Sequence, residues 1–183
     1  MRSDIGVGDP RIGEVYLSAD AIAARVRELG LQIAEDYAGR EPVLVGLLKA
    51  CLPFLCDLSR ATPIAHALDF VELAGYGRDH DGIRFLKDLD AEIEGRDVVL
   101  VDAVIDTGLT MRYLTRSLAI RDPRSLHIAT LFERPYRRLV DDLPVRYVGF
   151  TIPDEFFVGY GFELGERYRN LPDLRLVRDR RAS

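Results

Sequence analysis

The chain has few of the residues that form disulfides or zinc sites, with two cysteines and three histidines among 183 residues. It has no tryptophan. Cys51 and Cys56 stand five positions apart, which matches neither a zinc site nor a redox pair. We expect both to be small buried apolar side chains. A chain of this length buries roughly two thirds of its unfolded surface without cross-links. A single domain over residues 1–183 is therefore expected, and no disulfide is needed.

Long apolar runs and an excess of basic residues are also missing. No segment approaches the ~18 consecutive apolar residues of a membrane-spanning helix, and the first residues lack the apolar core of a secretion signal. The net charge is −5 and the sequence pI is about 5.3, which disfavours an extended nucleic-acid surface. These absences predict a cytoplasmic protein, with neither membrane nor nucleic acid as its partner.

What the chain does contain is an alternation of apolar and amphipathic segments. A helix is expected from its N-cap Ser18 to Gly39, and a second helix carries Pro53 in its first turn. Strands separated by helices predict an α/β fold with a mainly parallel, doubly wound sheet flanked by helices. The expected strands are 43–47, 66–71, 83–86, 98–102, 126–132 and 146–150.

Two further segments differ in composition from this core, which covers about residues 18–150. The glycine-rich stretch 75–82 is polar and has the composition of a lid over a site. Residues 151–172 mix glycine, proline and aromatic residues after the last expected strand. We expect them to form a small irregular hood together with the N-terminal segment.

The most informative segment is 98–110, where an apolar strand ends at acids and turns into a helix. Free backbone N–H groups of Thr107, Gly108, Leu109 and Thr110, together with the helix dipole, favour an anion such as a phosphate. Gly108 permits a close approach or a positive φ. The two threonine hydroxyls add side-chain hydrogen bonds. A simpler alternative is that Asp106 or Thr107 only caps the helix beside ordinary core.

Asp102 and Asp106 do not suit a phosphate alone, because a carboxylate repels it. Ribose hydroxyls, a magnesium ion or a proton to be removed would each explain them. The strand followed by Asp-Thr-Gly-Leu-Thr resembles the phosphoribosyl pyrophosphate motif of the type I phosphoribosyltransferases, in the hypoxanthine-guanine form. The resemblance extends over about residues 10–175, through 44–49, 85–95, 147–154, 157–161 and 168–172.

This resemblance implies the type I phosphoribosyltransferase fold and a pentosyltransferase activity. Such an enzyme transfers 5-phosphoribose from phosphoribosyl pyrophosphate to N9 of hypoxanthine or guanine, giving IMP or GMP and pyrophosphate in purine salvage. The family implies Mg²⁺ as cofactor and a homodimer or homotetramer as the assembly.

The resemblance also implies roles for individual residues. Asp106 manages the proton at purine N7 and Tyr76, in the lid, closes over the reaction. Asp102 and residues 107–110 bind the phosphoribose, while Asp102 and Glu163 assist the metal. Leu48 and Lys49, between which family members commonly have a cis peptide bond, bind pyrophosphate together with Arg169. The purine contacts Arg134, stacks on Phe156 and meets the backbone of Phe157.

Several of these positions depart from the family pattern. Ala103 replaces a carboxylate beside Asp102, and losing a charge-assisted hydrogen bond costs roughly 1.5–3 kcal/mol. Arg134 stands for a lysine, Glu163 for an aspartate, and Gly75 for a hydroxyl residue. These departures motivate a second hypothesis of a catalytically weak nucleotide or sugar-phosphate sensor, or of an enzyme with a shifted preference such as xanthine.

Each role also has an ordinary structural alternative. Lys49 would then be an exposed lysine before a helix, and Arg134 a surface arginine at a strand end. Phe156 and Phe157 would be core aromatics.

Overall fold

The computed structural model describes residues 8–74 and 83–178 and places a six-stranded sheet at its centre, in the order β4-β3-β2-β5-β6-β7. Only β4 runs antiparallel to its neighbour. Strand order reverses at β2 and β5, as in a doubly wound fold. The strands are β2 Val43–Leu47, β3 Ala67–Ala74, β4 Arg84–Lys87, β5 Asp97–Ile105, β6 Ser125–Glu133 and β7 Val145–Thr151.

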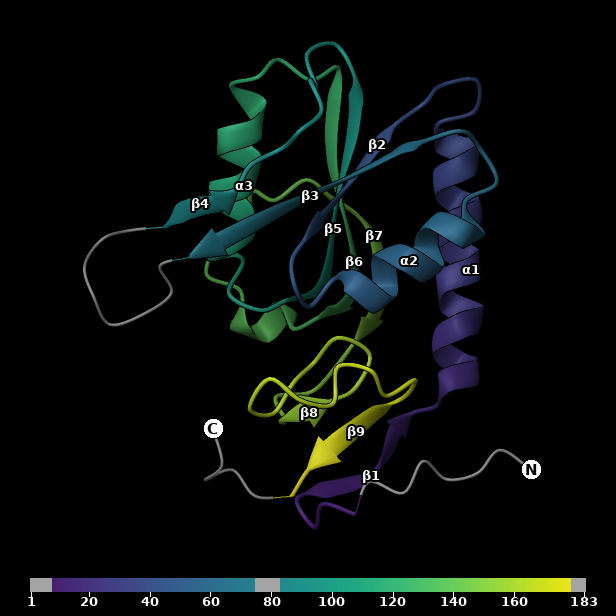
Figure 1. Cartoon of the computed structure of the whole chain (residues 1–183), viewed down its shortest axis with the longest axis vertical. Coiled ribbons are helices and arrows are strands. Elements are labelled where there is room, and N and C mark those ends of the chain that lie inside the picture. The colour runs from purple at the N-terminus through teal and green to yellow at the C-terminus, as the bar shows by residue number, and fades with distance from the viewer. Residues whose placement is uncertain (1–7, 75–82, 179–183) are drawn as a thin grey trace.

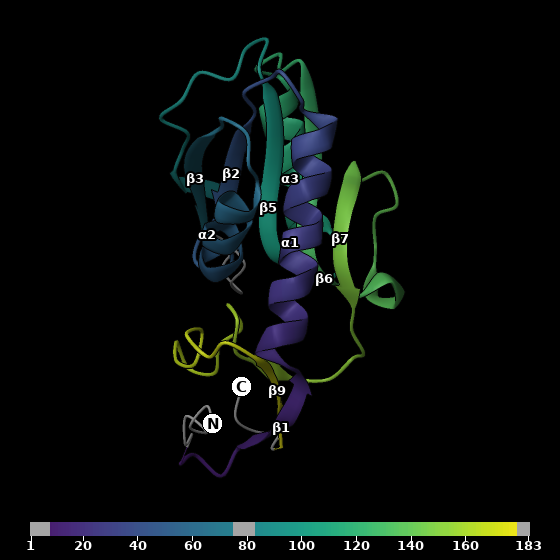
Figure 2. The same ribbon diagram turned by 90° about the vertical axis from the view of Figure 1, so that its right-hand side faces the viewer.

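Helices cover both faces of this sheet: α1 (Ala19–Asp36) and α2 (Leu52–Ala61) lie on one face and α3 (Leu109–Ala119) on the other (Figures 1 and 2). The Ser18 hydroxyl accepts the N–H of Ala21 at 3.2 Å, which confirms the expected N-cap of α1. Each helix buries one apolar stripe against the sheet, so the protein has a separate core on each side.

Strand β5 is longer than expected and is the most buried strand of the sheet. It continues past Asp102 because Val104 and Ile105 pair with Phe132 and Glu133 of β6. Asp102 and Ala103 therefore lie within the strand, whereas Asp106 follows its end. The polar side chain of Asp102 hid this continuation, because it interrupts the apolar run.

The hood is more regular than expected, which corrects the prediction of an irregular cap after a last strand at 146–150. Strands β1 (Ile12–Leu17), β9 (Leu174–Val177) and β8 (Phe157–Val158) form an antiparallel sheet of their own. Figure 1 shows this sheet below the core, where the arrowhead of β7 ends. Its strands are short and come from distant parts of the sequence, so local periodicity gives no signal for them.

The expectation that both cysteines are buried is confirmed for Cys51 and only partly met by Cys56. Both are free thiols, Cys51 being fully buried at the N-terminus of α2 and Cys56 half-buried within it. Burial raises the pKa of the Cys51 thiol to about 12. Among the helices described, none combines the length and apolar character needed to cross a bilayer.

Candidate active site at the end of β5

The predicted phosphate turn lies between β5 and α3 and encloses a pocket of about 170 Å³. Five of the predicted site residues line it together with apolar neighbours. Leu109, the sixth member of the predicted set, does not line the pocket and is exposed. The lining is formed by Asp102, Val104, Ile105, Asp106, Thr107, Gly108, Thr110 and Met111.

Gly108 is the N-cap of α3, and its φ of 80° lies in the left-handed region that favours glycine. A Cβ at this position would lie 2.6 Å from Cγ2 of Val140, so a side chain is also excluded by packing. The Thr107 carbonyl accepts the N–H of Leu139 at 2.9 Å, which holds the segment after β6 against the turn. The turn is therefore tied to the segment that follows β6.

Helix capping by Asp106 does not explain this turn. A glycine N-cap has no side chain to accept a hydrogen bond, and the Thr107 hydroxyl reaches the N–H of Leu109 only at 3.5 Å. No acceptor within the described residues takes the backbone N–H of Thr110. The helix terminus thus keeps N–H groups that an anion can satisfy.

Asp102 and Ala103 point to opposite faces of β5, as successive strand residues do. Asp102 lines the pocket on the α3 side, and its carboxylate accepts the N–H of Ala103 at 2.7 Å. Burial raises the pKa of this carboxyl to about 7, against the lowering effect of the N–H groups of Ala103 and Val104. The Asp102 carboxyl therefore exchanges its proton near neutral pH.

Ala103 is fully buried on the other face, beneath the hood. A Cβ built on Gly161 would lie 3.4 Å from the Ala103 Cβ and 2.2 Å from the Ala50 carbonyl oxygen. The hood backbone thus comes down closely over Ala50 and Ala103. A carboxylate at residue 103 would be placed in this close contact and not in the pocket beside Asp102.

Asp106 and Arg134 form an ion pair of 3.3 Å at the mouth of the site, with Arg134 from the end of β6. The guanidinium also donates to the Glu155 carbonyl at 2.8 Å and lies over the rings of Phe157 and Phe162, at 5.8 and 5.9 Å from their centres. Its side chain is only 7% exposed, and its Nε has no partner within the described residues. Arg134 is therefore not a surface arginine, and its guanidinium pairs with an acid that lines the pocket.

The two neighbouring phenylalanines occupy different settings. The Phe157 side chain is buried and packs against Tyr16 and Phe162, so the core alternative holds for its ring. Phe156, in contrast, is 47% exposed. An exposed aromatic ring can stack on a flat ligand.

The loop after β2 contains the expected cis peptide bond between Leu48 and Lys49. The Lys49 side chain is exposed and pairs with Glu166 at 3.0 Å, and Arg169 pairs with the same carboxylate at 3.1 Å. Two cations expected near pyrophosphate, Lys49 and Arg169, thus gather around Glu166, which the sequence analysis missed. The Gly165-Glu166 pair in a turn was the only local signal for it.

Glu163 is engaged by the hood backbone, because its carboxylate accepts the N–H of Glu166. The part of the chain described here holds no cluster of three or more metal-binding side chains. Mg²⁺ commonly takes one or two carboxylates and completes its shell with water and substrate phosphates. Asp102, whose carboxyl titrates near neutral pH in the pocket, fits that donor set, whereas Glu163 must first leave the hood turn.

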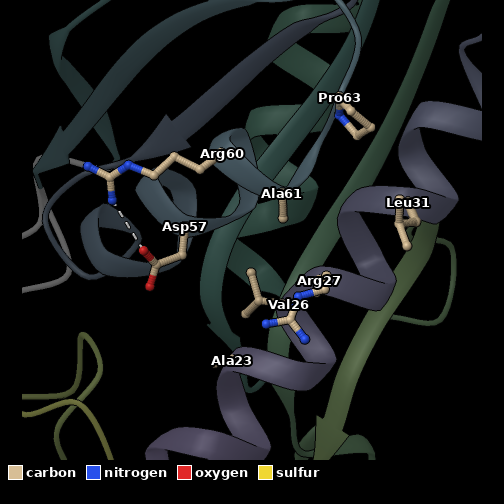
Figure 3. Close-up of a pocket in the computed structure, with 8 residues that line it drawn as sticks. All are labelled: Ala23, Val26, Arg27, Leu31, Asp57, Arg60, Ala61 and Pro63. Atoms are coloured by element: carbon tan, nitrogen blue, oxygen red, sulfur yellow. Dashed lines mark hydrogen bonds and ion pairs between the residues drawn. The ribbon is translucent and has the colours of Figure 1, made fainter.

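Tyr76 and the predicted lid 75–82 are outside the described residues. A larger hollow of about 530 Å³ lies between α1 and α2 and contains none of the predicted site residues (Figure 3). It is lined by Ala23, Val26, Arg27, Leu31, Asp57, Arg60, Ala61 and Pro63.

The chain is similar to known proteins over most of its length. Residues 14–163 match the model of the phosphoribosyl transferase domain. A hypoxanthine phosphoribosyltransferase of Salmonella typhimurium is 46% identical over 164 residues, covering 87% of this chain and 92% of the relative. A hypoxanthine-guanine phosphoribosyltransferase of Mycobacterium bovis is 42% identical over 169 residues, covering 87% and 83%.

Solved structures show the same fold. A hypoxanthine-guanine phosphoribosyltransferase from Bacillus anthracis superposes with a TM-score of 0.86 at 39% identity, covering 91% of this chain and 99% of that one. A Trypanosoma cruzi hypoxanthine phosphoribosyltransferase mutant, solved with the product IMP, gives a TM-score of 0.86 at 29% identity, with 93% of both chains covered. The chain therefore belongs to the phosphoribosyltransferase family, among the hypoxanthine and hypoxanthine-guanine phosphoribosyltransferases.

Proposed function

We propose that this protein transfers 5-phosphoribose from phosphoribosyl pyrophosphate to N9 of a 6-oxopurine, hypoxanthine or guanine, and releases pyrophosphate. The observation that carries the proposal is the pocket at the end of β5. It joins two carboxylates to a helix terminus with free N–H groups, and the buried Arg134 pairs with one of these carboxylates. The exposed Phe156 follows Glu155, whose carbonyl accepts a hydrogen bond from the same arginine. One ligand that needs all of these groups is a purine nucleotide.

The phosphoribose would lie along the turn. The 5-phosphate accepts from the N–H groups of residues 107–110 and from the hydroxyls of Thr107 and Thr110. Asp102 accepts the ribose hydroxyls once its carboxyl has lost its proton. Because Gly108 has no side chain, the phosphate can approach the backbone closely.

The base would lie between the pocket and the hood. Phe156 stacks on the purine, and the backbone of Phe157 meets its far edge. Arg134 donates to the 6-oxo group, which selects oxopurines because a guanidinium has no acceptor for a 6-amino group. Asp106, held by Arg134, takes or shares the N7 proton as the glycosidic bond forms.

The leaving pyrophosphate would be met by Lys49, the Leu48–Lys49 peptide and Arg169. Mg²⁺ bound with the donor would neutralise charge on the departing group, and Asp102 and Glu163 are the carboxylates to hold it. Tyr76 in the segment 75–82 would close over the reaction and exclude water. We also propose that the protein works as a homodimer or homotetramer.

The test is a turnover assay with the sugar donor, Mg²⁺ and each of hypoxanthine, guanine, xanthine and adenine. Nucleotide should form from hypoxanthine or guanine and not from adenine. Asp106→Asn should reduce turnover while leaving nucleotide binding in place, and Asp141→Asn, an exposed change outside the site, should leave turnover unaltered. Absence of product from every 6-oxopurine would remove the proposal.

Burial of Ala103 and the engagement of Glu163 favour a second candidate, a weakly catalytic sensor of nucleotides or sugar phosphates on the same fold. Such a protein binds phosphoribosyl pyrophosphate or IMP tightly without turnover. Thermal-shift titration beside the turnover assay separates the two functions. A clear preference for xanthine in the same assay would indicate the third possibility, an enzyme with a shifted base.

A further inference from the structure

Glu166 stands where two cations of the proposed pyrophosphate site converge. One carboxylate oxygen lies 3.0 Å from the Lys49 ammonium and the other 3.1 Å from the Arg169 guanidinium. Both cations lower the pKa of Glu166, most strongly through the hydrogen bond from Lys49. The carboxylate is thus a negative charge with two bridging oxygens, which is also how a diphosphate meets two cations.

The backbone of the hood fixes Glu166 in this position. Gly165 and Glu166 both have positive φ, 61° and 60°, between the bridged residues Leu164 and Arg167. This is the geometry of a tight two-residue hairpin turn. The N–H of Glu166 donates to the Glu163 carboxylate, which closes the turn.

The second cation is held by the same hood segment. Arg169 donates to the Gly161 carbonyl at 2.8 Å, and the Arg169 carbonyl accepts the N–H of Gly161 at 3.0 Å. Arg169 is therefore fixed to the backbone whether or not Glu166 is present. Its Nε is buried and has no partner within the described residues.

The contact with Lys49 is easily broken. The Lys49 and Glu166 side chains are 61% and 63% exposed, and exposed ion pairs contribute little. A pyrophosphate carries more negative charge than one carboxylate, so at sufficient concentration it can displace Glu166 from Lys49. The Lys49–Glu166 ion pair is thus present in the ligand-free protein, and it can break when a ligand binds Lys49.

We propose that Glu166 is an internal competitor of pyrophosphate, a carboxylate that neutralises Lys49 and Arg169 in the ligand-free protein and is displaced when a diphosphate binds. It weakens retention of the pyrophosphate product and sets the concentration of phosphoribosyl pyrophosphate that the enzyme needs. This inference rests on the proposed function, because it takes these two cations as the pyrophosphate site.

The experiment compares wild type with Glu166→Gln, which keeps the shape and removes the charge. We expect the Kd of Mg-pyrophosphate, measured by calorimetry, and the KM for phosphoribosyl pyrophosphate to fall about two- to tenfold, as loss of exposed ion pairs allows. The KM for hypoxanthine should not change. The gain should shrink at 0.5 M salt, where the Debye length is only about 4–5 Å.

Two controls separate competition from a general effect of charge. Glu94→Gln removes one exposed carboxylate before β5, at the other end of the strand from the pocket, and should leave pyrophosphate affinity unchanged. In a double-mutant cycle with Lys49→Met, the gain from Glu166→Gln should become smaller, because one of its two partners is gone. An equal gain in both backgrounds would overturn the pairing with Lys49.

Unchanged or weaker pyrophosphate binding by Glu166→Gln would overturn the inference, since Glu166 would then hold the cations in place for the ligand. If this variant unfolds at a lower temperature, Glu166→Asp, which keeps the charge on a shorter arm, serves instead and should bind pyrophosphate more tightly than wild type. Wild-type turnover is measured in parallel. Its absence would remove the proposed function, whereas normal turnover with unaltered affinity in the variants removes the inference alone.

Discussion

Replacing Asp102 by asparagine should stabilise the ligand-free protein, and increasingly so as the pH rises. Burial raises the pKa of the Asp102 carboxyl from 3.8 to about 7. The folded protein therefore keeps a proton that the unfolded chain releases. The stability associated with this proton is fully present below pH 3.8 and is lost as the pH rises through about 7.

The size of the effect follows from the two pKa values. The full difference corresponds to about 4 kcal/mol, of which about 2.5 kcal/mol develops between pH 5 and pH 8, mostly below pH 7. Asparagine carries no proton to lose and still presents an oxygen to the N–H of Ala103. The stability advantage of the variant over wild type should therefore grow by about 2.5 kcal/mol over this range.

The assay is urea unfolding of both proteins at pH 5, 6, 7 and 8 without ligand or magnesium. Asp141→Asn, an exposed aspartate outside the site, controls for the loss of one charge. A stability difference between Asp102→Asn and wild type that stays constant with pH would refute the reasoning. It would mean that Asp102 keeps the same charge throughout, so that its burial does not hold the proton.

Three further substitutions test other parts of the site. Ala103→Asp, although it restores a family carboxylate, should cost about 3 kcal/mol or more in the free energy of unfolding, because position 103 is fully buried and a carboxylate there loses its water. A gain in turnover at wild-type stability would contradict this. Arg134→Met should lower kcat/KM for hypoxanthine about ten- to a hundredfold through loss of a charged donor, and equal rates in the two proteins would argue against that role. Gly108→Ala should lower stability by at least about 1–2 kcal/mol, measured by urea unfolding, because φ is positive there and the new Cβ meets Val140; an unfolding curve like that of wild type would show that the turn can adjust.

The sequence alone was sufficient to locate the strands of the central sheet and the turn after β5. The local signals were four apolar residues followed by acids, a glycine and a helical stripe. The apolar run matches the burial of β5 on both of its faces. The position of Gly108 and the cap at Ser18 were predictable for the same reason, because backbone conformation restricts which residues fit. The cis bond at Leu48–Lys49 came from family resemblance, and no local physical signal predicts it.

Contacts between distant segments decided the rest. The pairing of β1 with β9 joins residues about 160 positions apart. These strands have only six and four residues, which is too short for a hydrophobic pattern to predict the pairing. The partner of Arg134 and the opposite facing of Asp102 and Ala103 depend on where the strands end and how the hood closes. Glu166 shows this most clearly, since a hairpin turn in the hood brings it to a lysine 117 residues earlier in the chain. The sequence determines which functional groups the chain carries. The tertiary structure determines which of them come into contact, because contacts between distant residues form only when the intervening chain has folded.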